Sequence, residues 1–282
     1  MIKFFVEPNA VCGSDIYLDK KEDIKHLTRV LRAKCGDAVC ISDGGEWEYE
    51  TEIAAIDEAC VTLRILDKQK PAREPCIRVS LYQGIPKAAK METIIQKNVE
   101  MGIDEIVPVF MERTVVTDKG QFGRKLARWQ KISDETVKQC KRSRIPQVAE
   151  PLSFDKMLED LANSYDLVIC PYENEENRTM KDALREFAGK ARTDAGNSAE
   201  ADEPLASAPR IAVIIGPEGG FSEKEIAKLS ACGISVQLVT LGKTILRLID
   251  VGDILRPNAD FVDGCVATAD ARQAGEVIPE IP

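Results

Sequence analysis

Two loops in the last third of the chain contain residue types that suit the binding of a small polar ligand. The apolar run Ile211–Ile215 leads into Gly216–Phe221 (GPEGGF), and the run Ile234–Leu241 leads into Gly242–Arg247 (GKTILR). Glycine permits sharp turns and a close approach of the backbone to a ligand. If both runs are parallel strands, the two loops meet at one edge of a sheet, where ligands of such sheets bind. The alternative is a pair of ordinary strand–helix turns.

A third loop, Pro171–Asn174, follows the strand-like run Asp166–Cys170. None of the three loops matches the phosphate-binding pattern GxxxxGK[ST], and none gives GxGxxG followed by a suitably placed acidic residue. With these two phosphate-binding patterns excluded, the loops offer backbone groups beside the apolar side chains of Leu241, Ile245 and Leu246. Such loops can hydrogen-bond the edge of an adenine ring while the apolar side chains cover its faces.

The elements that carry these loops follow an alternating pattern from Cys76 onward. The spacing predicts strands over 77–82, 103–110, 166–170, 211–215 and 234–241, and helices over 87–101, 124–140 and 179–187. Gly102 is placed to end the first helix, and Ser222 with Glu225 forms a capping box that starts another. Strands alternating with helices predict a parallel sheet covered on both faces. Residues 189–209 are poor in large apolar residues and are expected to form a surface insertion.

Residues 1–66 instead predict a small β-rich module. The turn Asp43–Gly45 lies between strand-like runs at 39–42 and 47–56, which is typical of a hairpin. A short helix over Asp23–Arg32 buries its apolar positions and leaves Arg29 and Arg32 available for solvent or phosphate. Asp67–Pro75 is the expected linker.

Composition excludes several classes of protein. The 282 residues carry a net charge of −9, which argues against a general polyanion binder. The segment Arg124–Arg144 is nevertheless basic, and a local patch can bind phosphates on an acidic protein; the alternative is a solvated helix face. The nine scattered cysteines, together with the lack of an export signal or membrane span, indicate reduced thiols in the cytoplasm. His26 is the only histidine, which excludes a histidine-rich metal site.

Five sequence blocks and an N-terminal motif resemble one known family. The order and spacing of these blocks are similar to those of the 16S ribosomal RNA uridine-N3 methyltransferases, of the SPOUT class of trefoil-knotted enzymes. The blocks are Leu81–Met91, Gln96–Pro108, Glu112–Val115, Ile215–Ser222 and Leu241–Arg247, and the N-terminal motif lies within His26–Asp37. The resemblance implies an α/β protein with a small PUA-like β-barrel over 1–70 that docks RNA. It implies a SPOUT methyltransferase domain over 76–255, leaving 256–282 as an atypical tail.

The resemblance also implies a reaction and its participants. The methyl donor is S-adenosylmethionine, the substrate is a uridine of small-subunit ribosomal RNA, and the protein is a homodimer that needs no membrane and no metal. The implied cofactor residues are Tyr172, Glu173, Gly216, Pro217, Glu218, Gly219, Gly220, Leu241, Gly242, Ile245 and Leu246.

Transfer to uridine N3 requires positive charge beside the carbonyl oxygens of the uridinate. Arg113 and Arg247 are the candidates for that role, and Glu218 is the candidate base, with a helix-terminal carboxylate as its alternative. The expected RNA-binding residues are Arg29, Arg32, Lys87, Lys97, Lys138, Lys141 and Arg142.

The sequence departs from the family immediately after Arg247. The family continues with Thr-Glu-Thr-Ala and an apolar helix, whereas this chain reads LIDVGDILRPN over 248–258. Gly252, Pro257 and Gly264 oppose a long helix. This departure leaves open an RNA-binding protein that keeps the fold with weakened catalysis. Within the same class, a SPOUT enzyme that methylates the ribose 2′-oxygen is the other alternative.

Overall fold

The computed structural model describes residues 3–45, 47–70, 74–75, 77–87, 89–116, 122–162, 164–194 and 208–241. Contacts divide the chain into two compact units. The first consists of Met1–Glu74 and Asp134–Ile145, and the second of Pro75–Ser133 and Pro146–Pro282. The helix α3 (Phe122–Cys140) therefore begins in the second unit and ends in the first. The sequence places that whole helix in the second domain.

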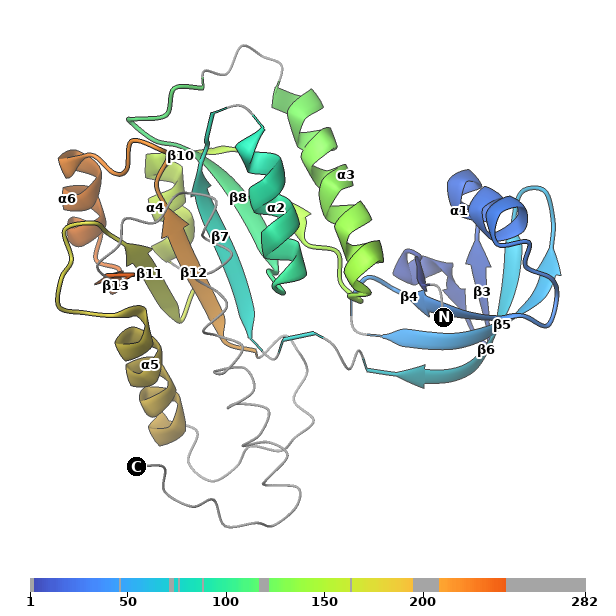
Figure 1. Cartoon of the computed structure of the whole chain (residues 1–282). Helices are drawn as coiled ribbons and strands as arrows, with labels where there is room; N and C mark the ends of the chain where they lie inside the picture. The colour runs from blue at the N-terminus through green and yellow to red at the C-terminus, as the bar shows by residue number, and fades with distance from the viewer. Residues whose placement is uncertain are drawn as a thin grey trace. The chain divides into compact units, whose positions relative to one another are not determined.

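The first unit is built on a six-stranded sheet curled into a half-barrel (Figure 1). Every pairing is antiparallel except that of β1 with β4. Alternate residues point into one apolar core, which includes Ile16, Ile41, Ile53 and Leu63. The predicted β-rich module is therefore confirmed. The strand order is β1 (Lys3–Phe5), β4 (Ala38–Ser42), β5 (Glu48–Ile56), β6 (Val61–Gln69), β3 (Asp15–Leu18) and β2 (Val11–Cys12).

Two details of the first unit differ from the sequence-based prediction. The predicted helix is a short α-helix, α1 (Lys21–Lys25), that continues as one turn of π-helix, η2 (His26–Val30). The predicted linker begins too early, because β6 continues to Gln69 and pairs with β5. Its extension is stabilised by Lys68, whose ammonium lies 3.9 Å from the ring centroid of Trp47. A 3₁₀ turn, η1 (Pro8–Ala10), precedes β2.

The second unit contains a seven-stranded sheet in which every pairing is parallel, as the alternating pattern predicts. Its central strand β12 is the continuous apolar run, which is buried because helices cover both faces of a parallel sheet. The strand order is β10 (Leu152–Ser153), β8 (Glu105–Phe110), β7 (Arg78–Gly84), β12 (Arg210–Ile215), β11 (Leu167–Pro171) and β13 (Val236–Val239), with β9 (Gln147–Val148) paired to β8.

Helices lie on both faces of this sheet. In Figure 1, α2 (Lys90–Glu100) lies in front of the sheet and α4 (Phe154–Ala162) behind it. The core on one face joins α4 and α6 (Glu223–Ala231) to the strands, and α5 (Met180–Asp194) packs on the other face. The predicted surface insertion begins too early, because α5 continues to Asp194.

Helix α4 is absent from the sequence-based prediction, although the chain carries its signal. Phe154, Met157 and Leu161 recur at helical spacing, and all three are buried against the sheet.

The parallel topology brings the carboxyl ends of β7, β8, β11, β12 and β13 to one edge. This is the edge at which the loops of interest begin. The closing segment of the expected knot, which follows Arg247, lies outside the described residues.

Candidate active site

The loop after β12 forms a tight curl at this edge. The amide of Gly220 donates to the carbonyl of Pro217 at 2.9 Å, and Gly220 has a left-handed φ of 67°. A Cβ on Gly216 would lie 3.2 Å from the carbonyl carbon of Gly220. The curl therefore leaves little room for a side chain at Gly216, and the backbone conformation of Gly220 is one that other residues rarely adopt.

The loop rests on the end of β7. A Cβ on Gly84 would lie 2.5 Å from the nitrogen of Pro217 and 2.8 Å from the carbonyl carbon of Gly216. Both distances are too short for a non-bonded contact, so only glycine fits at this position with the loop in place. The amide nitrogen Nε2 of the buried Gln83 donates to the carbonyls of Gly84 (2.9 Å) and Gly216 (3.3 Å). The position of the loop is thus fixed by close backbone contact together with buried hydrogen bonds.

Glu218 joins the loop to the start of α2. Its Oε1 accepts hydrogen bonds from the amide of Lys87 and from Nζ of Lys90, both at 3.0 Å. Partial burial opposes ionisation of this carboxyl, but the two hydrogen bonds outweigh it and hold the pKa of Glu218 below its ordinary value. A carboxylate with a lowered pKa is a weak general base near neutral pH, which disfavours the proton-accepting role predicted for Glu218.

Arg113 lies directly on the glycine loop. Its Nη1 donates to the carbonyl of Gly219 at 2.7 Å, and its Cβ is 3.1 Å from the place where a Cβ of Gly219 would be. Arg113 reaches this position from the turn after β8. The structure therefore brings together a predicted catalytic arginine and the predicted cofactor loop, which are separated by about a hundred residues in the sequence.

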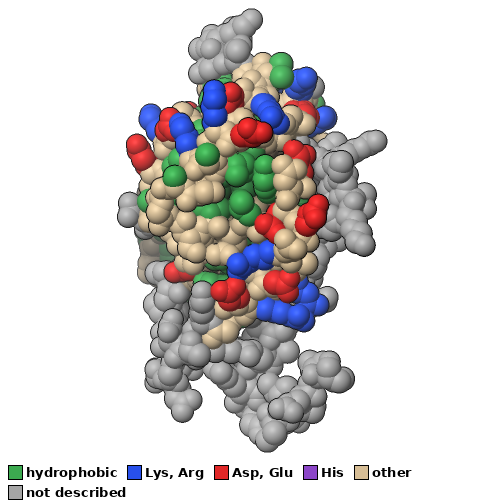
Figure 2. All heavy atoms as spheres, turned by 90° about the vertical axis from the view of Figure 1, so that its left-hand side faces the viewer, with side chains coloured by type: hydrophobic (Ala, Val, Ile, Leu, Met, Phe, Trp, Pro, Cys, Tyr) green, Lys and Arg blue, Asp and Glu red, His purple; other side chains and the backbone are tan. Residues whose placement is uncertain are grey.

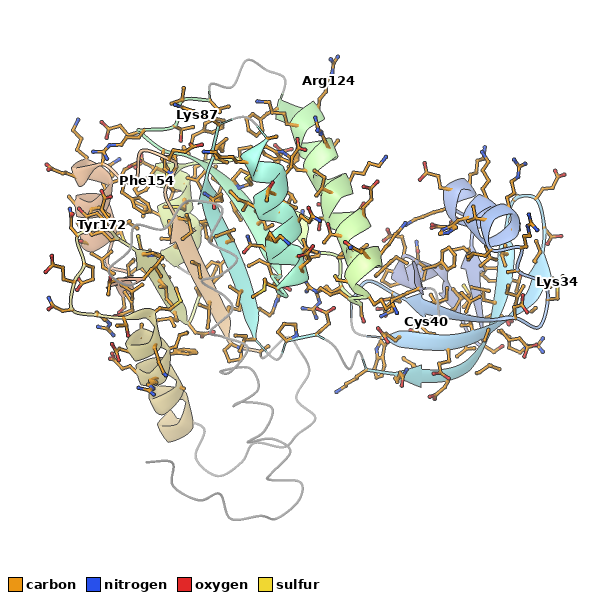
Figure 3. The ribbon with its side chains drawn as sticks, in the orientation of Figure 1. Lys34, Cys40, Lys87, Arg124, Phe154 and Tyr172 are labelled. Atoms are coloured by element: carbon orange, nitrogen blue, oxygen red, sulfur yellow. The ribbon has the colours of Figure 1, made fainter. Side chains whose placement is uncertain are left out.

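The loop after β11 approaches the same curl. Oε1 of Glu173 lies 3.6 Å from the position that a Cβ of Gly220 would occupy. The amide of Tyr172 donates to the carbonyl of Val239 at 3.0 Å, which ties this loop to the end of β13. Figure 3 labels Tyr172 in this loop and Lys87 beyond the end of β7. The predicted meeting of the Pro171–Asn174 and Gly216–Phe221 loops is confirmed.

Apolar side chains gather beside these loops. Figure 2 shows them in the middle of the face that carries α6 and β13, surrounded by charged groups. The partly buried apolar residues there include Tyr172, Ile226, Val236 and Leu238. Leu241, at the end of this region, is half-buried. Gly242, Ile245, Leu246 and Arg247 lie outside the described residues.

The chemistry of this edge fits S-adenosylmethionine. The glycine curl can serve as a cradle because Gly219 is exposed and Gly220 partly exposed, so backbone donors and acceptors there can reach a ligand. Glu173 supplies an anionic acceptor of the kind that hydroxyl and ammonium groups prefer, and Tyr172 and Leu241 supply apolar surface. A polar, cationic nucleoside needs these three kinds of contact.

The predicted RNA-binding residues differ in their surroundings. Arg29, Arg32, Lys87, Lys97, Lys138 and Lys141 are exposed. Lys97 pairs with Glu100 on α2 at 3.0 Å, and Lys138 pairs with Asp23 at 3.7 Å. The side chain of Arg124, at the first turn of α3, also extends away from the sheet of the second unit (Figure 3).

Arg142 is an exception that corrects the prediction. Its guanidinium donates to Oε2 of Glu74 at 2.7 Å, and both side chains are only 6% exposed. The other oxygen of Glu74 accepts the amides of Ser143 (2.7 Å) and Arg144 (3.0 Å). A guanidinium buried in such a pair cannot contact a phosphate, so Arg142 stabilises the first unit instead.

Three further observations bear on other classes of site. The described residues contain no group of three or more His, Cys, Asp and Glu side chains that could hold a metal ion. No helix among them is long and apolar enough to cross a membrane. The seven described cysteines are free thiols.

Comparison with known proteins identifies the family. Residues 72–249 match the model of the RNA methyltransferase domain, and residues 18–66 match the model of the RNA methyltransferase PUA domain. The chain therefore belongs to the RNA methyltransferase family and carries its PUA domain ahead of its methyltransferase domain.

Named relatives resemble this chain over most of its length. It is 28% identical over 225 residues to a protein of Bacillus subtilis named ribosomal RNA small subunit methyltransferase E. The aligned region covers 77% of this chain and 82% of the relative. A protein of the same name from Synechocystis is 28% identical over 247 residues, and the aligned region covers 88% of this chain and 73% of that relative.

Two solved structures share the fold. The Neisseria gonorrhoeae protein of that name, bound to S-adenosyl methionine, superposes with a TM-score of 0.69 at 23% identity, over 93% of this chain and 98% of that one. A Legionella pneumophila chain, solved with the cofactor SAM bound, gives a TM-score of 0.66 at 26% identity, over 91% of this chain and 97% of that one.

Sequence reasoning missed several residues that build the site. Gln83, Gly84, Glu112 and Ser222 lie inside the recognised blocks and Glu225 lies three residues after one, yet none is predicted to belong to the site. The available signal was their position in those blocks, but the roles depend on contacts between segments that are far apart in the chain.

Proposed function

We propose that this protein transfers a methyl group from S-adenosylmethionine to N3 of a uridine in small-subunit ribosomal RNA. The observation that carries the proposal is the placement of the Arg113 guanidinium on the Gly219 carbonyl, beside a glycine cradle at the carboxyl edge of the sheet. The names of the relatives point to the same class of substrate.

The cofactor is assigned to the three loops at this edge. Backbone groups of Gly216–Gly220 hold its polar parts, Glu173 accepts from its hydroxyl or ammonium groups, and Tyr172 and Leu241 cover its apolar surface. When bound, S-adenosylmethionine supplies an electrophilic methyl group on a sulfonium. We extend the pocket to Gly242, Ile245 and Leu246, which follow Leu241 in the chain.

Arg113 acts on the nucleophile. Uridine N3 must lose a proton before it attacks, and the resulting negative charge spreads onto the two carbonyl oxygens of the base. A guanidinium beside one of these oxygens lowers the cost of ionisation. Because Glu218 has a lowered pKa and is occupied by Lys87 and Lys90, we assign the proton to solvent and give Glu218 the task of holding the loop.

RNA docking is assigned to exposed basic residues of both units. In the first unit these are Arg29, Arg32, Lys138 and Lys141, and in the second they are Lys87 and Lys97. Their ammonium and guanidinium groups suit phosphate contacts, which position RNA without reading its sequence. Along the sequence the docking domain covers 1–70 and the catalytic domain 76–255, of which Asp134–Ile145 belongs to the first compact unit, and 256–282 lies outside both domains.

We also propose that the protein is a homodimer that works in the cytoplasm, where its substrate is assembled. The apolar residues of β13, at the edge of the sheet, support an interface between two copies. Light scattering of the purified protein tests this, and a monomer at micromolar concentration counts against it.

The decisive experiment is a methylation assay on small subunits that lack the modification, followed by mass analysis of the nucleosides. We expect 3-methyluridine from the wild-type protein. A ribose-methylated nucleoside would instead identify a 2′-O-methyltransferase, and RNA binding without product would identify a non-catalytic RNA-binding protein.

Arg247→Ala tests the second predicted catalytic arginine in the same assay. We expect product formation to fall far more than binding to the small subunit, because Arg247 is proposed to act on the reacting base. If binding and activity fall together, Arg247 is a docking residue.

A further inference from the structure

Glu225 makes more hydrogen bonds than a helix cap requires. In the capping box at the start of α6, its Oε2 accepts the amide of Ser222 at 2.9 Å, and Oγ of Ser222 accepts the amide of Glu225 at 3.2 Å. Its second oxygen, Oε1, accepts the amide of Glu112 at 2.7 Å, from the turn after β8. Glu225 is only 3% exposed. One buried carboxylate thus joins two segments that are distant in the chain.

A second contact strengthens this link. Oγ of Ser222 donates to Oε2 of Glu112 at 2.6 Å. That hydrogen bond, and then the charge of Lys224, holds the pKa of Glu112 below its ordinary value, so the Glu112 side chain is an ionised acceptor. Both the main chain and the side chain of Glu112 are therefore attached to the first turn of α6. We call these hydrogen bonds among Glu112, Ser222 and Glu225 the Glu225 bridge.

The bridge acts on the next residue in the chain, Arg113. On its other side, the amide of Met111 donates to Oγ1 of Thr114 and the amide of Thr114 donates to the carbonyl of Met111, both at 3.0 Å. Arg113 thus projects from a turn that is fixed at both ends. Its guanidinium meets the carbonyl of Gly219, three residues before Ser222. The bridge and the arginine contact together bind the same two segments.

We propose that Glu225 is a positioning residue for Arg113, and that it holds the guanidinium at the glycine loop where the uridine must bind. This inference rests on the proposed methyltransferase function. Charge-assisted hydrogen bonds of a buried carboxylate are strong and directional, so they suit this task. Arg113 touches the substrate, whereas Glu225 acts only through Arg113.

The substitution Glu225→Gln changes the shape of the side chain little. It breaks the bridge because one of the two acceptor oxygens becomes an NH₂ group that faces a backbone N–H donor. The matched control is Glu223→Gln. Glu223 is exposed and also lies in the first turn of α6, so its substitution removes the same charge from the same helix end. The difference between the two variants isolates the bridge.

The test is a double-mutant cycle on kcat for methyl transfer to small subunits. We expect Glu225→Gln to lower kcat about 10-fold and Arg113→Ala about 100-fold, while the double variant stays near 100-fold because the two residues act as one unit. Glu223→Gln is expected to stay within about twofold of the wild type, since surface charges change little. Cofactor affinity and melting temperature are measured for each variant.

A double variant whose kcat is down about 1,000-fold would overturn the inference. For residues with independent roles the free-energy losses add, so the fold-losses in kcat multiply. Equal effects of Glu225→Gln and Glu223→Gln would overturn it as well. If Glu225→Gln folds poorly, Ser222→Ala takes its place in the cycle, since it removes the link to the Glu112 side chain and keeps both carboxylate bonds. A wild-type protein without product refutes the proposed function, and the inference falls with it, whereas an active wild type with additive variants refutes only the inference.

Discussion

Adding one methyl group at Gly84 is expected to displace the glycine loop of the active site. The Cβ of an alanine there would lie 2.5 Å from the nitrogen of Pro217, 2.7 Å from its Cδ and 2.8 Å from the carbonyl carbon of Gly216. These are backbone and ring atoms, which cannot rotate away as a long side chain can. To reach an ordinary contact of 3.4 Å, the loop must withdraw by about 0.9 Å, the difference between 3.4 and 2.5 Å.

Two quantities should respond to this displacement. Overpacking of this kind lowers the free energy of unfolding by about 1–3 kcal/mol. For a unit of this size, that loss corresponds to a fall in Tm of about 2–12 °C. A shift of about 1 Å in a positioned group lowers the rate of methyl transfer about 100-fold. We also expect weaker binding of S-adenosylmethionine, because the displaced loop forms the cradle.

The assays are calorimetric titration with S-adenosylmethionine, thermal unfolding, and methylation of small subunits. Gly189→Ala is the matched control, because it makes the same chemical change inside α5, where an added Cβ meets no atom within 4 Å. Removing that helix glycine should raise stability by about 0.5–1 kcal/mol. The reasoning is refuted if Gly84→Ala matches the wild type in Tm and binds the cofactor within a factor of about two, which is about 0.4 kcal/mol of binding free energy.

Three further predictions concern stability and RNA binding. Arg142→Ala should lower the free energy of unfolding in urea by about 3 kcal/mol, because it leaves the buried Glu74 carboxylate without its cationic partner; a loss under about 1 kcal/mol would contradict this. Burial, and then repulsion from nearby carboxylates, raises the pKa of Glu105, so the folded state holds that proton more tightly and loses stability as the pH rises above 4.5, the ordinary carboxyl value. Glu105→Gln should therefore gain stability over the wild type as the pH rises, and parallel pH profiles of the two proteins would rule this out. Neutralising Lys138 and Lys141 should reduce the salt slope of RNA binding by about 2, and an unchanged slope would remove them from the RNA surface.

The parallel sheet could be predicted because its signal is local. The continuous apolar run Ile211–Ile215 and the helical spacing in α2 depend only on nearby residues, as does the capping box of Ser222 and Glu225. The end of β6 could not be predicted in the same way. Residues 67–69 are polar and resemble a linker, and they become a strand only because β5 offers backbone partners.

Charge patterning misassigned Arg142 for a related reason. A run of basic residues gives no information about which of them is buried, and the partner of Arg142, Glu74, lies 68 residues earlier in the chain. The surroundings of Glu218 were equally beyond the sequence, which offered this carboxylate either as a catalytic base or as a helix-terminal carboxylate. Its lowered pKa depends on Lys87 and Lys90, which only the fold brings to it.

The sequence alone determined the family resemblance, the order of the two domains, the parallel sheet and the glycine loop at its edge. These features follow from local periodicity, glycine geometry and blocks of residues in fixed order. Only the tertiary structure decided which groups meet at that edge. The withdrawal of Arg142 into a buried pair, the support of the loop by Gly84, and the bridge from Glu225 to Glu112 each join segments far apart in the chain. Hydrogen bonds and close contacts of this kind are set by the packing of whole elements, so no local pattern encodes them.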